Sequence, residues 1–131
     1  MPERTYLQAL RDGLREEMLR DPAVYVLGED VAVGGPFGVT KDLIDEFGAN
    51  RVINSPISEG TVVGLAVGAA VLGFRPVVEV MFADFITLAM DQLVNHAAKL
   101  HYMSGGQLRV PLTIRVQGGA SGGWGGSRRR R

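Results

Sequence analysis

Glu59 is the acidic residue of this chain whose setting most clearly indicates chemistry. It follows the run Asn-Ser-Pro-Ile-Ser at residues 54–58 and enters an apolar, glycine-containing segment at residues 60–73. A carboxylate at the mouth of so apolar a segment is costly to desolvate unless it gains a hydrogen-bond partner. Alternatively, Glu59 is a helix-start acid stabilised by the macrodipole, an effect of ~0.3–1 kcal/mol. That alternative accounts for the acid but not for the glycines after it.

Gly60, Gly64 and Gly68 recur at every fourth position of this segment. On a helix this spacing places them on one face, which carries only hydrogen atoms and lets another backbone approach closely. We therefore expect a carboxylate at the end of a closely packed helix. The packing partner is either another chain or the rest of this domain.

Two further acids, Glu29 and Asp30, stand one glycine after an apolar run at residues 24–27 that is typical of a short buried strand. In open parallel α/β sheets, functional groups gather at the carboxyl ends of strands, and these acids and Glu59 all fit that position. A turn-initiating acidic pair is the alternative for Glu29 and Asp30, and the sequence alone favours it. Glu79 differs from the other three because it lies within a predicted strand.

Phe82 and Phe85 lie at the junction between a predicted strand, residues 76–81, and the helix after it. Most such phenylalanines are core residues, although a ring at this position can also stack on a flat heterocycle. His96 and His101 are five residues apart, which does not place them on one helix face. Without cysteines or clustered acids they complete no metal-binding set, so packing or surface roles are the simplest interpretation.

Several common site motifs are missing from the sequence. It has no GxGxxG or P-loop spacing, which excludes a nucleotide-phosphate cradle of those types. It also has no nucleophile elbow and no visible Ser/His/Asp set, so a serine hydrolase is not supported.

Composition places the chain among soluble globular domains. It has 131 residues, of which 46% are hydrophobic and 21% charged, and it has no cysteine for disulfide or thiolate chemistry. The formal net charge is zero, but four of the fourteen basic residues form the terminal run 128–131. Without that run, ten basic residues stand against fourteen acidic ones, so the rest of the chain has a net charge of −4. This negative charge argues against nucleic acid as a partner.

No secretion signal is visible at the start of the sequence. The most apolar stretch, residues 60–74, is shorter than the ~20 residues that a membrane span requires. We therefore expect no membrane partner and a cytoplasmic location.

Hydrophobic periodicity and turn residues divide the chain into alternating helices and strands. The first helix carries apolar residues at steps of three and four, and Asp21-Pro22 ends it. Thr40 is expected to cap the second helix and Gly48 to stop it. We expect helices at residues 5–20, 40–47, 59–73 and 84–103, and strands at residues 24–27, 51–53, 76–81 and 110–116.

Short, continuously apolar strands that alternate with helices are typical of a parallel sheet covered on both faces. The predicted fold is therefore α/β, with three layers and a mainly parallel sheet. Six of the eleven residues 117–127 are glycine, and four arginines follow. Because so long a loop normally leads to another element, the chain looks cut short. We expect one domain at residues 1–117 and a flexible or aberrant tail at residues 118–131.

Several short motifs match a single family pattern in order: Gly28-Glu-Asp, Pro56-Ile-Ser-Glu59, Gly64-Leu-Ala-Val-Gly68, Arg75-Pro76, Asp91-Gln92, Ala98-Lys99 and Tyr102-Met-Ser-Gly-Gly106. In these motifs, residues 4–125 resemble the pyrimidine-binding, transketolase-like domain of the β subunit of 2-oxoacid dehydrogenase decarboxylating components. That group includes the pyruvate, branched-chain 2-oxoacid and acetoin dehydrogenases. The most specific piece is Glu59 followed by Gly64 and Gly68, which matches a thiamine-diphosphate signature of the superfamily.

The resemblance implies that thiamine diphosphate is the cofactor and that Glu59 hydrogen-bonds N1′ of its aminopyrimidine ring and activates it. It implies that Phe85 stacks on this ring, with Met81 and Ile57 beside it. It also makes Glu29 a second acid, in a proton relay between paired sites.

The resemblance further implies metal ions and partner chains. The family binds the diphosphate and Mg²⁺ through a Gly-Asp-Gly motif of an α subunit, and this sequence has no such motif. It would therefore supply only the pyrimidine side of the site, in an α₂β₂ heterotetramer with a second β subunit. The backbone carbonyl of Leu112 matches a position that helps hold K⁺ in some relatives.

The implied activity is oxidative decarboxylation of a 2-oxoacid with acyl transfer to lipoamide on the acyltransferase core of the complex. The family continues with a Gln-His-Ser element and a carboxyl-terminal domain that docks this core. Arg128 stands about where that histidine belongs, so we expect a truncated or misread reading frame. The alternative function is a non-catalytic, truncated interaction module that retains only the subunit interface.

Overall fold

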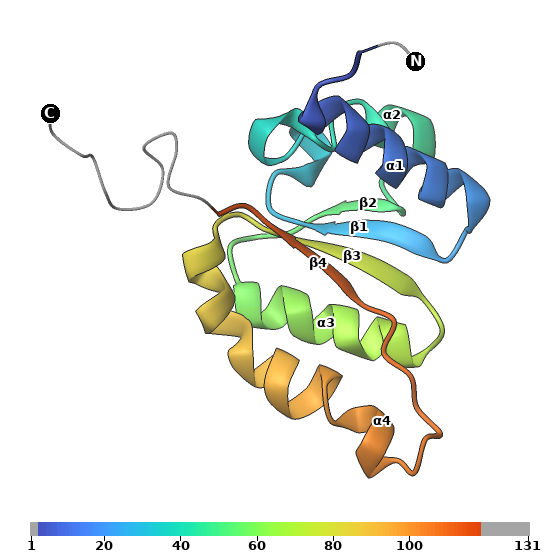
Figure 1. The fold of residues 1–131 in the computed structure, drawn as a ribbon, viewed down its shortest axis with the longest axis vertical. Coiled ribbons are helices and arrows are strands. Elements are labelled where there is room, and N and C mark those ends of the chain that lie inside the picture. The colour runs from blue at the N-terminus through green and yellow to red at the C-terminus, as the bar shows by residue number, and fades with distance from the viewer. Residues whose placement is uncertain (1–2, 119–131) are drawn as a thin grey trace, which may run out of the picture.

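Four parallel strands form one sheet in the order β2–β1–β3–β4 (Figure 1). Their bounds are Val24–Gly28 (β1), Val52–Asn54 (β2), Arg75–Val80 (β3) and Thr113–Val116 (β4). The structure is a computed structural model and describes residues 3–118, so the tail predicted at residues 118–131 lies outside the described residues except for Gly118. Because all pairs are parallel, the carboxyl ends of the four strands meet at one edge.

Helices cover both faces of this sheet. α1 (Tyr6–Arg20) and α2 (Leu43–Phe47) lie on one face, and α3 (Glu59–Val71) and α4 (Leu100–Met103) lie on the other (Figure 1). Two short 3₁₀ turns, Val31–Val33 (η1) and Pro36–Gly38 (η2), lie in the loop between β1 and α2. The predicted three-layer α/β fold with a parallel sheet is therefore confirmed.

The first helix begins where its capping residues predict. The side chain of Thr5 accepts a hydrogen bond from the Gln8 backbone N–H, and the Gln8 side chain accepts one from the Thr5 backbone N–H. This capping box satisfies two N–H groups that have no partner inside the helix. Asp21 ends the helix, and Met18 is the residue of α1 that is fully buried.

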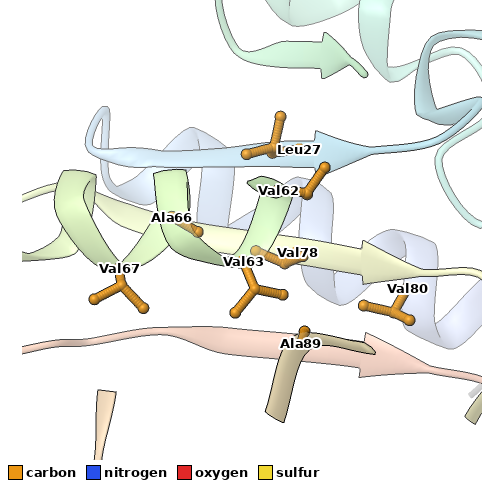
Figure 2. Packing of buried hydrophobic residues seen from close by; sticks show 8 residues of the cluster. All are labelled: Leu27, Val62, Val63, Ala66, Val67, Val78, Val80 and Ala89. Atoms are coloured by element: carbon orange, nitrogen blue, oxygen red, sulfur yellow. The ribbon is translucent and has the colours of Figure 1, made fainter. Parts of the chain in front are cut away.

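The sheet buries one apolar cluster on each face, because side chains alternate along each strand. The cluster on the α3 face joins the sheet to α3 (Figure 2) and comprises Leu27, Val62, Val63, Ala66, Val67, Val78, Val80 and Ala89. The cluster on the α1 face comprises Met18, Val24, Val26, Val31, Leu43 and Val52. α3 is thus fixed by its own valines and alanines, which leaves its glycine face turned elsewhere.

The prediction that Thr40 caps the second helix was wrong. Thr40 is fully buried, and its hydroxyl donates to the backbone carbonyl of Val31 at 2.7 Å, inside the loop that precedes the helix. Asp42 therefore takes the position before α2, with a left-handed backbone and no side-chain capping bond. Gly48, at φ 78°, ends α2 as predicted.

The single long helix predicted at residues 84–103 was also wrong. The segment divides into a 3₁₀ helix, Ala83–Ala89 (η3), a π-helix, Gln92–Ala97 (η4), and α4. The side chain of Gln92 packs so closely on α3 that a Cβ added to Gly64 would lie 3.3 Å from its Oε1. The winding changes along this segment where it packs on α3, and apolar spacing alone does not report such a change.

The fourth strand is shorter than the predicted residues 110–116. The backbone N–H of Leu112 donates to the carbonyl of Val110 instead of to a neighbouring strand, so β4 starts at Thr113. The turn after α4 has positive φ at Gly105 and Gly106.

Gly28 is the position where the fold leaves no room for a side chain. A Cβ placed there would lie 2.6 Å from the backbone oxygen of Glu79 and 2.7 Å from its Cβ. We expect Gly28→Ala to lower the free energy of unfolding by about 1–3 kcal/mol through overpacking. Urea unfolding followed by far-UV circular dichroism measures this change.

Gly13 provides the matched control, because a Cβ added there meets no atom within 4 Å and the residue lies inside α1. Gly13→Ala should raise the free energy of unfolding by about 0.5–1 kcal/mol. Equal effects of the two substitutions would contradict the close packing at Gly28.

Candidate functional site at the carboxyl edge of the sheet

Glu29 and Glu59 lie at the edge formed by the carboxyl ends of the strands. Glu29 directly follows the last residue of β1, and Glu59 is the first residue of α3, reached through the loop after β2. β1 and β2 are neighbours in the sheet, with Gly28 opposite Asn54. This is the edge at which ligands bind in open α/β sheets.

The two carboxylates are close enough to affect each other. Desolvation raises the pKa of Glu29 above its ordinary value, the negative charge of Glu59 raises it further, and that of Asp30 adds to the rise. The sequence alone favoured a turn-initiating role for Glu29 and Asp30. The structure places both residues in a turn, and it also puts Glu29 in the electrostatic field of Glu59.

Glu59 is half-buried, and its carboxylate accepts no hydrogen bond within residues 3–118. It is the acid of the first turn of α3, where the helix macrodipole favours a negative charge. The preceding Ser58 makes no side-chain capping bond, and its hydroxyl donates to the hydroxyl of Thr61 at 2.7 Å. The carboxylate is thus oriented by the helix start and remains available to a group outside this domain.

Phe85 and Ile57 flank this helix start. The backbone oxygen of Leu88 lies 3.2 Å from a Cβ built on Gly60, so η3, which carries Phe85, packs on the first turn of α3. The Phe85 ring meets Phe82 edge to face with centroids 5.5 Å apart and is 41% exposed, and Ile57 is 79% exposed. Two apolar side chains next to a partly buried acid form a surface that suits a flat, partly polar ring.

Met81 points to a neighbouring cavity of about 280 Å³. The lining residues come from the loop after β1, the end of β3 and the end of β4, and are Asp30, Val33, Gly35, Pro36, Phe37, Met81, Phe82 and Gln117. The side-chain oxygen of Gln117 is buried there without a hydrogen-bond partner. Glu59, Ile57 and Phe85 do not line this cavity, so the structure divides the five residues predicted at this edge between two adjoining regions.

Leu112 lies far from these residues along the strand direction. It precedes the amino end of β4, and it packs against the α3-side apolar cluster. Glu59 lies at the opposite, carboxyl edge, so a K⁺ ion at the Leu112 carbonyl would be structural and would not touch the acids.

A buried ion pair on β3 and β4 was not foreseen from the sequence. Arg115 Nε donates to Glu79 Oε2 at 2.5 Å, and Nη2 of the same guanidinium donates to Oε1. The Glu79 side chain is only 2% exposed, and burial raises its pKa to about 7, against the opposing effect of Arg115. The sequence indicates this ion pair only through one acid, Glu79, and one base, Arg115, each of which lies between apolar residues of a strand.

Two other kinds of site are not found in residues 3–118. No group of three or more His, Cys, Asp or Glu side chains is placed to hold a metal ion. Within the same range, no helix is both long enough and apolar enough to span a lipid bilayer.

The fold and the acids at its carboxyl edge define an α/β domain of the kind that binds a ligand across the ends of its strands. Residues 3–129 match the family described as transketolase, pyrimidine binding domain. This match covers nearly the whole chain, and the chain belongs to that family.

Relatives with known names extend the comparison. The chain is 52% identical over 118 residues to the pyruvate dehydrogenase E1 component subunit beta of Rickettsia bellii, a match that covers 89% of this chain and 36% of the relative. It is 48% identical over 120 residues to that subunit of Chaetosphaeridium globosum, covering 91% of this chain and 37% of the relative. It is 50% identical over 113 residues to the chloroplastic subunit beta-3 of Arabidopsis thaliana, covering 86% and 28%. The chain thus spans roughly a third of the length of these relatives.

The proximity of the two acids can be tested by titration. Because the charge of Glu59 raises the pKa of Glu29, Glu59→Gln should lower that pKa toward its ordinary value, and Asp30→Asn should lower it less. The carboxyl ¹³C shift of Glu29, followed by NMR across a pH series, measures both changes. Asp84→Asn, at an exposed acid of η3, is the control and should leave the titration of Glu29 unchanged.

The same shift has a consequence for stability. Since the folded state binds the Glu29 proton more tightly than the unfolded state, the stability that this group contributes is present below its unfolded pKa and is lost as the pH rises through its folded pKa. Glu59→Gln should reduce this loss. An unchanged Glu29 titration in that variant would contradict the placement of the two acids.

Proposed function

We propose that this chain is the pyrimidine-binding part of the β subunit of a thiamine-diphosphate-dependent 2-oxoacid dehydrogenase. The reaction is oxidative decarboxylation of a 2-oxoacid with acyl transfer to lipoamide. The observation that carries the proposal is the Glu59 carboxylate, half-buried at the start of α3 beside Glu29 and without a hydrogen-bond donor in residues 3–118. Pyruvate is the favoured substrate because the relatives reported above are pyruvate dehydrogenase subunits.

The residues at this edge suit an aminopyrimidine ring. Such a ring is flat and apolar on its faces and carries nitrogen atoms on its rim, so it requires a ring or methyl group to pack on and a carboxyl to pair with. Phe85 and Ile57 offer exposed apolar groups, and Glu59 offers the carboxyl. Thiamine diphosphate, when bound, supplies the nucleophilic thiazolium carbon and the electron sink for decarboxylation.

Each of these side chains has a distinct part in the proposed site. Glu59 shares a proton with ring nitrogen N1′, which requires that the carboxyl be kept from bulk water. Phe85 orients the ring by stacking, and Ile57 and Met81 exclude water from its rim. Glu29, whose pKa is raised, keeps its proton to a higher pH than an ordinary glutamate, which suits a relay.

The proposed partners supply the parts of the site for which this sequence has no motif, above all the Gly-Asp-Gly motif that binds the diphosphate and Mg²⁺. An α subunit, in an α₂β₂ assembly with a second β subunit, is assigned the binding of Mg²⁺ and the diphosphate. The backbone carbonyl of Leu112 is assigned to K⁺. The acyltransferase core of the complex is the partner that receives the acyl group. α3 offers a contact surface for assembly, because its glycine face borders an open groove of about 620 Å³ between α3 and Gln92. Leu65 and Leu72 on this groove are 61% and 80% exposed. The proposed location is the cytoplasm.

A second candidate function is an interaction module that assembles with the α subunit but performs no turnover. The observation that favours it is the open groove along the glycine face of α3, where Leu65 and Leu72 are exposed, because such a surface serves assembly without chemistry. Assembly and turnover must therefore be measured separately.

Turnover is tested by Glu59→Gln in the complex reconstituted with an α subunit. Because the amide cannot share a proton with N1′ as a carboxylate does, we expect 2-oxoacid decarboxylation to fall by at least a hundredfold, with assembly unchanged. Glu16→Gln, at an exposed position of α1, is the control and should retain full activity. If Glu59→Gln keeps wild-type turnover, the proposed role is wrong; if the wild-type complex assembles but is inert, the interaction module is favoured.

Assembly is tested at Gly68, where a Cβ would meet no atom within 4 Å in this domain. Gly68→Leu should leave the fold intact, because leucine is a better helix former than glycine, yet it should block a close-packed partner. Sedimentation velocity of the chain mixed with the α subunit should show loss of the complex. Gly13→Leu, at an equally open glycine of α1, should assemble normally, and equal assembly of the Gly68 variant would exclude this face as an interface.

A further inference from the structure

Three neighbouring strands present two successive rows of residues toward the α1 face at their carboxyl ends. Gly28 lies opposite Glu79, and Glu79 lies opposite Arg115, so these three form the first row. The second row is Met81 and Gln117, which directly follow the last residues of β3 and β4, two positions beyond Glu79 and Arg115. Both of these line the 280 Å³ cavity, so the first row lies directly behind its wall.

The first row is held by the ion pair between Glu79 and Arg115. Two hydrogen bonds join the carboxylate to the guanidinium in a forked geometry, which fixes orientation as well as distance. The Glu79 side chain is 2% exposed and that of Arg115 is 20% exposed. A pair with so much desolvation contributes little net stability compared with apolar side chains of the same size. A gain in stability therefore does not explain why this position holds an ion pair. The fixed geometry of the two hydrogen bonds is a better explanation.

Gly28 completes the row on the β1 side. A side chain there would lie 2.6 Å from the Glu79 backbone, so β1 can approach β3 this closely only with glycine. The residue after Gly28 is Glu29, whose pKa is raised in part by the charge of Glu59. Glu79 is thus paired with the residue before Glu29 on one side, and it lies two residues before Met81 in its own chain segment on the other.

We propose that Glu79 and Arg115 are positioning residues: their buried ion pair aligns the carboxyl ends of β3 and β4 and so places Met81 beside the cofactor ring. This role rests on the proposed function, since it gives Met81 a cofactor to contact. Neither Glu79 nor Arg115 touches the ring. They act through the strand ends that they hold.

The test uses the chain reconstituted with its α subunit and the double variant Glu79→Leu/Arg115→Leu. Because both charges are removed together, no unpaired buried charge remains and the fold is expected to survive. We expect at least tenfold weaker binding of thiamine diphosphate by titration calorimetry. We also expect a changed ¹³C-methyl resonance of Met81 in the complex without cofactor. Arg115→Lys, which keeps the charge but not the fork, should show a smaller change of both kinds.

A surface ion pair gives the matched control. Arg15 Nε and Nη2 donate to the two carboxylate oxygens of Glu46 at 2.6 Å each, in the same forked geometry but at exposed positions of α1 and α2. Arg15→Leu/Glu46→Leu should bind the cofactor within twofold of wild type and leave the Met81 resonance unchanged.

Two results would overturn the positioning role: a folded Glu79→Leu/Arg115→Leu variant that binds thiamine diphosphate within twofold of wild type, or a Met81 resonance that does not move in that variant. Failure of the proposed function looks different, because the wild-type complex itself would then bind no thiamine diphosphate. In that case the Met81 resonance of the variants still decides whether the ion pair positions the strand ends.

Discussion

Parallel pairing of β1, β2 and β3 is the constraint on which the site depends. It brings the residues that follow three separate strands to one edge, so acids and apolar groups distant in sequence become neighbours. The alternating side chains of the same strands are anchored in two apolar clusters, one on each face. The edge is therefore positioned by the whole sheet and does not depend on the loops alone.

Negative charge accumulates at this edge without compensation from the described residues. Glu29, Asp30 and Glu59 interact there, and the pKa of Glu29 rises because it is desolvated and faces the other two. An acid of this kind is expected where a site is to hold or pass a proton. By contrast, Glu79 lies one row behind the edge and is neutralised by Arg115. The Glu79 carboxylate is thus paired and supports the geometry of this edge, whereas those of Glu29 and Glu59 have no hydrogen bond or ion pair within residues 3–118 and are available for chemistry.

The parallel fold and the location of the acids could be predicted from the sequence because both follow local patterns. Continuous apolar strands, the capping box at Thr5 and the glycine that ends α2 each act over a few residues. The errors arose where a distant contact decides the outcome. The hydroxyl of Thr40 bonds within its loop and caps no helix, and the helix at residues 84–103 changes its winding as it packs on α3. The ion pair of Glu79 depends on strand register, which a single sequence does not report.

The central claim is that the carboxyl of Glu59 pairs with the aminopyrimidine of thiamine diphosphate across a subunit interface. A crystal structure of the chain in complex with an α subunit and this cofactor tests it most directly. The account predicts a Glu59 carboxyl oxygen within about 2.6–3.2 Å of ring nitrogen N1′, with the Phe85 ring on the aminopyrimidine face. A Glu59 side chain that faces bulk water, or a pyrimidine ring bound away from α3, would contradict it.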